Sequence, residues 1–416
     1  MRLVLLGGQV ITGDGTRWER GVVVVDGETI SEIADALAYR GRPEDRVIDL
    51  EGHTVLPGII DCHAHLTLDG GPNNVQQARA DTRPWATIRA LRNAAAALSA
   101  GVTTLRDAGG DGEVVFAVRD AIARGLATGP RVVACGRPVC ITGGHGWWIP
   151  GLEADGPAAV RQGVRSLVKG GADAIKLMAT GGLTEVSPDV GMRASQMEED
   201  ELAAGVAEAR KAGRRTPAHA HGAEGARRAA RAGVDSIDHG IFLDDEACGI
   251  IAERGAWYTP TLRATAPSPL KTVDAGCPAH IVERHRIAQG HHAESFRRAL
   301  RAGVRIGYGT DSGSTGNTHG ENLAELALMV DLGLPPLAAL HCATAGAARL
   351  LGLDDRLGTL APGKQADLIV ARGDVLADIR SLADPHTVRA VVRGGEIVVA
   401  KDGLVARNTL TAKDCH

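Results

Sequence analysis

The segment Ile59-Ile60-Asp61-Cys62-His63-Ala64-His65 joins an apolar run to a His-x-His pair and sets the pattern of the central chain. Short β-type segments of this kind recur, and most are followed by a stretch rich in Ala, Arg and Glu. The candidate strands are 59–65, 102–107, 131–135, 173–178, 216–219, 236–239, 257–261 and 304–310. The expected helices are 85–100, 113–127, 158–169, 197–212, 222–232, 279–302 and 320–331. This alternation predicts an α/β fold, a (β/α)8 TIM barrel with a parallel sheet.

The two ends of the chain have a different, β-rich character. Gly-containing turns separate the candidate strands there, which are 3–6, 22–26, 47–55, 366–370, 388–392 and 397–399. We expect the two ends to pair into one small β-sandwich. The sequence therefore predicts a discontinuous sandwich domain, 1–57 plus 358–416, and a barrel domain that covers 58–357.

Composition argues against several classes of protein. With 50 acidic and 46 basic residues, the chain lacks the basic excess that nucleic-acid-binding proteins direct at phosphates. Aromatic residues make up only 3%, too few for a base-stacking platform. No segment approaches the roughly 20 apolar residues of a membrane helix, and the first apolar run is too short for a signal peptide. The seven scattered cysteines include no Cys-x-x-Cys pair, so we expect a cytoplasmic protein with no nucleic-acid or membrane partner.

Reactive side chains fall at the ends of the predicted strands, where a TIM barrel forms its active site. His63 and His65 end the first strand, and because residues two apart on a strand point to the same face, both imidazoles can reach one metal ion. The ends of the fifth, sixth and eighth strands add His219, His239 and Asp311. The joint placement of these residues predicts a catalytic metal site at the barrel mouth.

Lys176 lies in an apolar run of the fourth predicted strand, between Ile175 and Leu177. Because a protonated lysine would repel a metal ion, we expect a neutral amine that has captured carbon dioxide as a carbamate, which can bridge two metals. A structural salt bridge is the alternative. The ligand types suit two divalent ions, expected to be zinc, which would activate a water as hydroxide for attack on an amide or ester. Asp311 would take the proton of that water and pass it to the leaving nitrogen.

Five motifs resemble those of the amidohydrolase superfamily, and the resemblance covers nearly the whole chain. They are Pro57-Gly58-Ile59-Ile60-Asp61-Cys62-His63-Ala64-His65, Ile175-Lys176-Leu177-Met178-Ala179-Thr180-Gly181-Gly182, His219-Ala220-His221-Gly222, Asp238-His239-Gly240 and Gly309-Thr310-Asp311. Within this superfamily the chain is most similar to the branch with cytosolic dipeptidases that cleave Xaa-Pro or Xaa-Arg/Lys bonds and with ochratoxin-degrading amidases. The resemblance implies a homo-oligomer. It also implies metal ligands, which are His63, His65 and Asp311 at the more buried ion, His219 and His239 at the other, and carboxylated Lys176 between them.

The resemblance further implies residues that touch the substrate. His145 stands where relatives contact the substrate carboxylate or the tetrahedral oxyanion, and His221 stands where close relatives contact the substrate. Ordinary loop structure is the alternative for both. Trp147, next to Trp148, is expected to form an apolar wall for a substrate side chain, or else to pack against a loop or subunit. Tyr258 is a further candidate contact, with barrel packing as the alternative.

Several other residues carry weaker expectations. Asp238 and Ser312 replace the Glu and Ala expected from the resemblance, and we expect neither to touch the ligand set, although both can alter the pocket floor. A substrate with an acidic end would need a basic partner, for which Arg193 and Arg263 are candidates. The histidines of the long helical stretch near residue 290 are expected on a solvated face, and they are His285, His291 and His292.

The leading functional hypothesis is a binuclear metal-dependent enzyme that hydrolyses the amide bond of a small-molecule substrate, a dipeptide or an N-acyl amino acid. The alternative is a hydrolase of a cyclic amide, lactone, carbamate or heterocycle, similar to imidazolonepropionase-like or deaminase-like proteins. Lys176 argues against that alternative, because deaminase-type members usually work with one metal and without the lysine. A non-catalytic scaffold is a remote possibility, since every expected ligand position is filled.

Overall fold

A computed structural model describes residues 2–384 and 386–401 of the chain. The chain folds into two compact units. The unit that we call the sandwich unit comprises the described parts of Met1–Ile60, Ala96–Thr104 and Gly320–His416. The unit that we call the barrel unit comprises Asp61–Ala95 and Leu105–His319.

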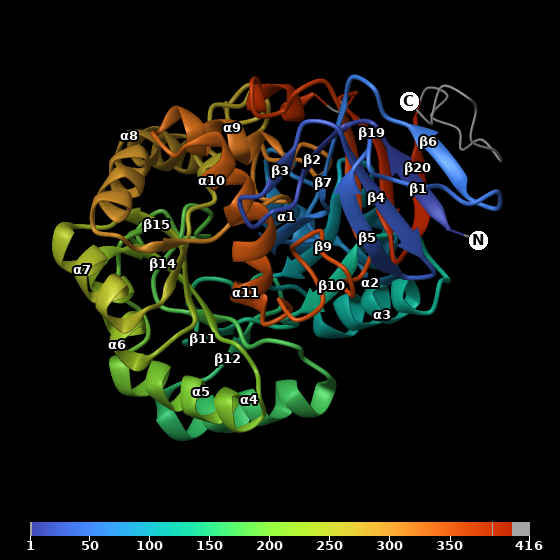
Figure 1. Ribbon diagram of the computed structural model, residues 1–416. Coiled ribbons are helices and arrows are strands. Elements are labelled where there is room, and N and C mark those ends of the chain that lie inside the picture. The colour runs from blue at the N-terminus through green and yellow to red at the C-terminus, as the bar shows by residue number, and fades with distance from the viewer. Residues whose placement is uncertain (1, 385, 402–416) are drawn as a thin grey trace. The chain divides into compact units, whose positions relative to one another are not determined.

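The central strands form a parallel barrel (Figure 1). One sheet has the order β10-β9-β8, with β8 (Ile59–Ala64), β9 (Val102–Asp107) and β10 (Arg131–Ala134). The other has the order β12-β11-β13-β14-β15-β16-β17. Its strands are β11 (Val139–Cys140), β12 (Leu152–Glu153), β13 (Leu177–Met178), β14 (Pro217–Gly222), β15 (Ser236–Phe242), β16 (Trp257–Thr259) and β17 (Arg305–Ile306).

Backbone hydrogen bonds close the two sheets into one ring. Cys62 N–H donates to the Tyr308 carbonyl at 3.0 Å, and Asp311 N–H donates to the His63 carbonyl at 2.7 Å, which joins the first strand to the last. On the other side, β10 and β11 together act as the third strand, interrupted near Gly136 (φ 69°). The prediction of an eight-membered TIM barrel is confirmed, with this interruption in the third strand.

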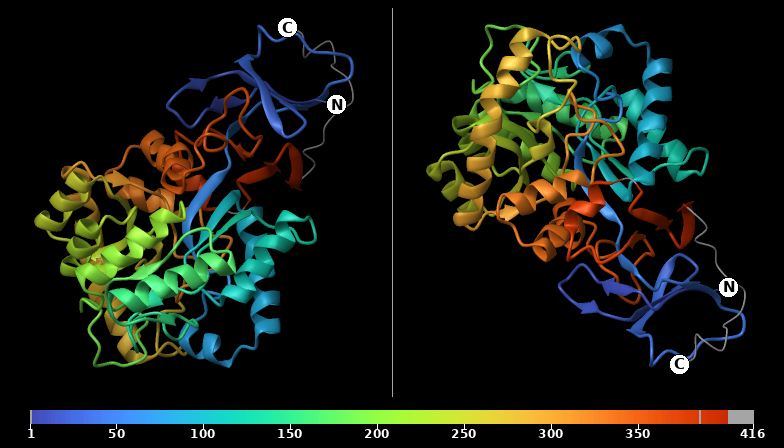
Figure 2. Two further views of the ribbon diagram at one scale, coloured as in Figure 1. Left: turned by 90° about the horizontal axis from the view of Figure 1, so that it is seen from below. Right: turned by 90° about the horizontal axis from the view of Figure 1, so that it is seen from above.

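Helices connect the strands, and Figure 1 shows α6, α7 and α8 outside β14 and β15, while Figure 2 shows the same green, yellow and orange helices from two further sides. In α6, small residues face the strands and arginines face outward, which allows close packing of the helix. The α-helices are α1 (Asn74–Ala80), α2 (Arg83–Ser99), α3 (Gly112–Ala123), α4 (Gly156–Gly170), α5 (Glu199–Lys211), α6 (Ala223–Ala232), α7 (Asp245–Arg254), α8 (Ala279–Arg301), α9 (Ala324–Asp331), α10 (Pro336–His341) and α11 (Ala347–Leu351). No described helix is both long enough and apolar enough to span a bilayer.

The sandwich unit contains two sheets built from both ends of the chain. The first has the order β5-β4-β1-β6, with β1 (Leu3–Leu6), β4 (Gly21–Asp26), β5 (Thr29–Asp35) and β6 (Arg46–Asp49). The second has the order β20-β19-β18-β7-β2-β3, with β2 (Gln9–Ile11), β3 (Arg17–Trp18), β7 (His53–Pro57), β18 (Leu368–Arg372), β19 (Val388–Arg393) and β20 (Glu396–Ala400). Antiparallel pairing of β7 with β18 links the two chain ends, and apolar residues of both sheets share one core. The predicted sandwich is thus confirmed, while the domain limits 1–57, 58–357 and 358–416 stay a prediction, and residues 402–416 lie outside the described part.

Element boundaries differ from the prediction where local chemistry intervenes. The expected strand 47–55 is two strands, because Glu51 and Gly52 (φ 74°) form a turn between β6 and β7. Helix α7 was not expected, although Asp244 caps its N-terminus by accepting a hydrogen bond from Ala247 N–H.

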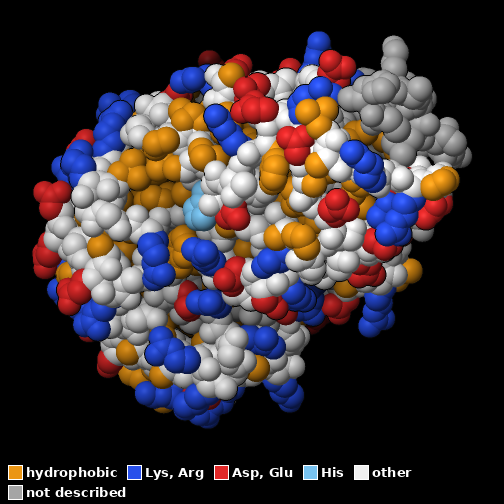
Figure 3. Space-filling view, viewed as in Figure 1, with side chains coloured by type: hydrophobic (Ala, Val, Ile, Leu, Met, Phe, Trp, Pro, Cys, Tyr) orange, Lys and Arg blue, Asp and Glu red, His pale blue; other side chains and the backbone are white. Residues whose placement is uncertain are grey.

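On the face shown in Figure 3, basic and acidic side chains are interspersed.

Candidate metal centre

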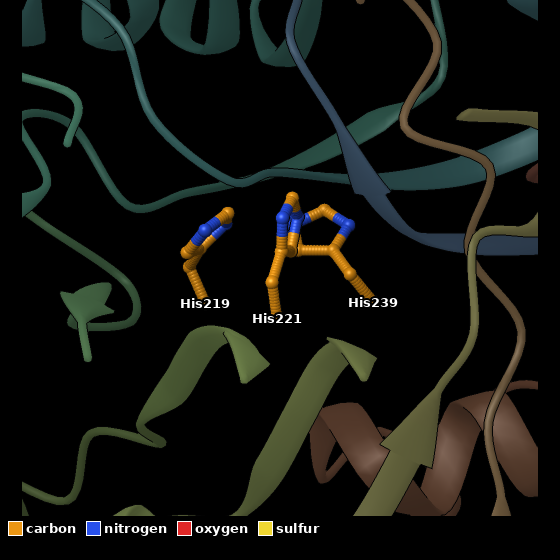
Figure 4. Close-up of side chains that lie close together, drawn as sticks. All are labelled: His219, His221 and His239. Atoms are coloured by element: carbon orange, nitrogen blue, oxygen red, sulfur yellow. The ribbon is translucent and has the colours of Figure 1, made fainter. Parts of the chain in front are cut away.

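Two groups of three side chains meet in one cavity of the barrel unit. The ligand atoms of each group all lie within 4.8 Å of one another. One group contains His63, His65 and Asp311, and the other contains His219, His221 and His239 (Figure 4). The cavity, about 610 Å³ with its opening to solvent, is also lined by Lys176. All six residues predicted as metal ligands therefore line the same space.

Hydrogen bonds orient the imidazoles of His63 and His65 in the first group. Each bond is made by the Nδ1 atom, on the side of the ring that faces away from Asp311. His63 Nδ1 lies 2.9 Å from Asp238 Oδ2, while the buried Nε2 has no hydrogen-bond partner in the described structure. His65 Nδ1 lies 2.8 Å from the Gly109 carbonyl, so that nitrogen carries the proton and Nε2 faces Asp311 Oδ1 at 3.3 Å. The Nε2 atoms of both rings therefore face Asp311, and a metal ion bound there would take a lone pair from each.

Residues in and beside the two groups have unusual backbone conformations. Among the described residues, only three that are not glycine have a positive φ, and they are His239 (71°), Thr261 (52°) and Asp311 (59°). Such conformations are disfavoured for L-residues and cluster at functional sites. For Asp311, burial alone would raise the carboxyl pKa, but the hydrogen bond with His65 and the neighbouring imidazoles lower it to about 2. The carboxylate is ionised at neutral pH, as a metal ligand or a general base must be.

The second group comes from the ends of two neighbouring strands. His219 and His221 are two residues apart on β14 and His239 lies on β15, so the three imidazoles lie next to one another (Figure 4). His219 Nε2 is 3.1 Å from the Gly181 carbonyl, and His239 Nδ1 is 2.8 Å from Thr261 Oγ1. Burial, then the neighbouring histidines, lower the pKa of all three rings well below the usual range. The three imidazoles are therefore neutral, which is the form of histidine that metal ions bind.

Lys176 and Asp238 form a buried ion pair at the barrel floor. Lys176 Nζ donates to Asp238 Oδ2 at 2.5 Å, and the same oxygen is the one that faces His63 Nδ1. Ser236 Oγ donates to the other carboxylate oxygen, at 2.9 Å, and Arg106 lies 3.6 Å from it. The expectation that Asp238 does not touch the ligand set is wrong, because its side chain points from β15 into the barrel.

Two opposing effects determine the pKa of Lys176. Burial lowers its pKa, whereas the carboxylate of Asp238 raises it, and the net direction is downward. The structure contains the salt bridge that the sequence left as the alternative to a carbamate. Release of the proton would leave an amine able to react with carbon dioxide, so carboxylation stays a prediction.

The predicted substrate contacts separate into two sets. His145 and His221 line the cavity. His145 Nδ1 lies 3.1 Å from Glu185 Oε1, and its ring packs on Gly182, where a Cβ would come within 2.2 Å of it. Trp148 lines the cavity, and Trp147 is not among the lining residues.

Three of the expected contacts do not line the cavity and have partners elsewhere in the structure. The indole of Trp147 lies against the guanidinium of Arg79, 5.7 Å from the ring centroid. Tyr258 is fully buried, and its hydroxyl donates to the His239 carbonyl at 2.9 Å, so it holds the backbone of His239 and does not line the cavity. Arg193 stacks on Phe242 at 3.9 Å, outside the cavity lining.

Sequence reasoning missed the buried face of α8. His285 and His292 are buried and only His291 is exposed, so the expected solvated face is wrong for two of the three histidines. A helical period predicts this arrangement, because the buried positions recur every three or four residues and include Ile281, His285, Ala288, His292 and Ser295. His285 lines the cavity, which adds it to the site.

The donor set fits a divalent cation. Neutral imidazoles, an ionised carboxylate and the buried, unpartnered Nε2 of His63 provide nitrogen and oxygen ligands of the type that zinc and related ions take. A barrel with these groups at the ends of its parallel strands defines a class of metal-dependent hydrolases.

Comparison with known proteins agrees with the site. The amidohydrolase family matches residues 54–398, and the chain belongs to this family. It is 30% identical, over 95% of this chain and 86% of the relative, to an ochratoxinase from Aspergillus niger. The crystal structure of a Xaa-Pro dipeptidase with methionine bound in its active site is 34% identical, with a TM-score of 0.88 over 95% of this chain and 99% of that chain. A prolidase in complex with N-methylphosphonate-L-proline is 33% identical, with a TM-score of 0.88 over 96% and 100%. The protein is thus a hydrolase of carbon–nitrogen bonds.

Asp238→Asn is expected to weaken zinc binding by about 10- to 100-fold, because Asp238 orients the imidazole of His63 from its far side. Competition with a chromophoric chelator measures the affinity. Asp235→Asn is the matched control, since Asp235 lies on the same segment but pairs with Arg215 at the surface. Equal zinc affinity in Asp238→Asn and the wild type would show that Asp238 does not position His63 for zinc binding.

Proposed function

We propose that this protein is a binuclear metal-dependent amidohydrolase that cleaves the amide bond of a dipeptide or an N-acyl amino acid. The observation that carries the proposal is the presence of two adjacent donor groups in one cavity. Lys176 lines the same cavity as both groups, and its charge lowers the pKa of His63 in one group and of His219 and His239 in the other.

In this proposal each donor group holds one divalent ion, expected to be zinc. The ligands are His63, His65 and Asp311 for one ion, His219 and His239 for the other, and carboxylated Lys176 for both. Bound there, the ions would lower the pKa of a water molecule and polarise the scissile carbonyl. Asp311 would accept a proton from water at a carboxylate oxygen and deliver it to the leaving nitrogen.

The remaining residues of the cavity bind and orient the substrate. His145 lines the cavity beside Glu185 and would contact the carbonyl oxygen of the substrate. His221 Nδ1 is buried without a partner and is available for a second contact. Apolar side chains line the rest of the cavity and suit an apolar acyl or amino-acid side chain, namely Leu68, Trp148, Ile149, Met178 and Leu183.

The names of the similar proteins support an amide substrate with an amino-acid leaving group. A Xaa-Pro dipeptidase and a prolidase act on such bonds by their names, and the chain covers nearly the whole of both. We retain as part of the proposal a homo-oligomer, a cytoplasmic location and the catalytic domain 58–357.

The test is mass-spectrometric detection of products from pooled L-dipeptides and N-acyl amino acids with zinc-loaded protein. We expect cleavage concentrated on a narrow set of C-terminal residues. Turnover of lactones, carbamates or heterocycles, with none in the dipeptide and N-acyl pools, would instead support the alternative and contradict the proposal.

His221→Phe is expected to raise KM by about tenfold or more with unchanged metal content, because the variant loses a hydrogen bond to the substrate and keeps the ring volume. Steady-state kinetics and metal analysis of the same sample give both values. His291→Phe on the exposed face of α8 is the control. Loss of one metal ion in His221→Phe would mean that His221 is a ligand of the second group.

A further inference from the structure

His285 is a buried histidine with no hydrogen-bond partner inside the protein. It lies on α8, lines the cavity of the two donor groups and is only 6% exposed. Neither Nδ1 nor Nε2 has a partner among the described residues. Because a buried polar group without a partner is destabilising, such a ring indicates a contact that a ligand completes.

His292 shows that burial on this helix face does not by itself leave a ring unpartnered. It lies seven residues further along α8, with Nδ1 2.8 Å from Thr265 Oγ1 and Nε2 2.9 Å from the His239 carbonyl. His292 is therefore a structural residue that fastens the helix to β15. His285 has the same burial and the same helix face without any such role.

The backbone around His285 is held in place. The guanidinium of the adjacent Arg284 donates to carbonyls of the loop after β13, including Val190 at 2.7 Å and Ser187 at 3.0 Å. The hydrogen bonds of Arg284 and those of His292 hold α8 in place on both sides of His285. A side chain on a helix held in this way can contact the substrate in one defined position.

Different charged groups lie near His145 and His285, and His285 is influenced both by Lys271 and by the carboxylate of Asp311. Next to His145 lies the buried carboxylate of Glu185, which would repel a substrate carboxylate. Near His285 lies the buried Lys271, whose Nζ donates to the carbonyls of Ala264 (2.8 Å) and Ala266 (2.7 Å). Burial and then the charge of Lys271 lower the pKa of His285 to about 3, so the ring is neutral and keeps one N–H donor.

We propose that His285 binds the carboxylate of the substrate through a ring N–H and thereby selects substrates that end in a free carboxylate. The inference rests on the proposed amidohydrolase function for the identity of the substrate. It assigns the carboxylate to the side of the cavity formed by α8 and leaves His145 for the scissile carbonyl.

The test compares the binding of L-methionine and L-methioninamide to the zinc-loaded protein by isothermal titration calorimetry. The two probes differ only in that a carboxamide replaces the carboxylate, and neither contains an N-acyl bond. The wild type is expected to bind L-methionine about tenfold more tightly, the size expected of a hydrogen bond to a charged group. His285→Leu is expected to reduce this preference to about twofold, whereas His285→Gln, which keeps an N–H donor, retains part of it.

His291→Leu, on the exposed face of the same helix, is the matched control and is expected to keep the full preference. An unchanged preference in His285→Leu and His285→Gln, or loss of the preference in His145→Asn alone, would overturn the inference. A wild type that binds both probes equally would also overturn it. This test measures binding, so its failure can be told apart from failure of the proposed function. If the substrate pools show no hydrolysis but the His285-dependent preference for L-methionine is intact, the proposed function is refuted and the contact with His285 stands.

Discussion

Asp311→Asn is expected to lower kcat by about three orders of magnitude, because it removes the carboxylate that accepts the proton from water and returns it to the leaving nitrogen. Asn has nearly the same shape and keeps one oxygen toward His65, whose Nε2 lies 3.3 Å from Asp311 Oδ1. The left-handed backbone at this position (φ 59°) is also tolerated by Asn. Substrate binding and folding are therefore expected to change much less than turnover.

Steady-state kinetics on the substrate found in the pools, with metal analysis of each sample, separates these effects. Asp69→Asn is the matched control, because Asp69 lies on a nearby loop and accepts from Gly71 N–H at 2.8 Å without lining the cavity. A kcat within about threefold of the wild type in Asp311→Asn, with metal retained, would exclude Asp311 as the proton carrier.

Lys176→Ala is expected to lose most of the bound metal and at least about a thousandfold of the activity. The variant removes the oxygen ligand proposed to join the two ions, and it leaves Asp238 buried without the ammonium that lies 2.5 Å from it in the structure. Short carboxylic acids such as formate or acetate can fill the space of the missing side chain and supply oxygen ligands. Partial recovery of activity with these acids is therefore expected in the variant and not in the wild type.

Incubation with ¹³C-bicarbonate and zinc gives a second readout for Lys176. The wild type is expected to show a carbamate carbon resonance that Lys176→Ala lacks. Full activity of Lys176→Ala, or a wild type with two bound ions and no carbamate resonance, would show that Lys176 serves only as the partner of Asp238.

The fold and the clustering of the candidate ligands were predictable because they follow local periodicity. A strand alternates sides every residue, so His63 and His65 were expected to reach one ion, and the ends of parallel strands meet at one mouth. The same rule predicts that His219, His239 and Asp311 come together. The structure places all of them around one cavity.

The parts that were not predicted depend on contacts between distant segments. Asp238 lies one residue before His239, and only the closed barrel shows that its side chain reaches Lys176 and His63. The choice between Trp147 and Trp148 depends on a loop turn at Gly146 (φ 89°), because adjacent residues point in different directions. The helical period of α8 places His285 on the buried face, whereas the charged residues beside it in the sequence favour a solvated face.

Metal titration tests the central claim most directly. Metal-free protein receives zinc in increments, and amide hydrolysis and bound zinc are measured in each sample. The two donor groups predict that activity rises to a plateau at two zinc ions per chain and disappears again on chelation. Full activity in the metal-free protein, or a plateau at one ion, would contradict the binuclear account.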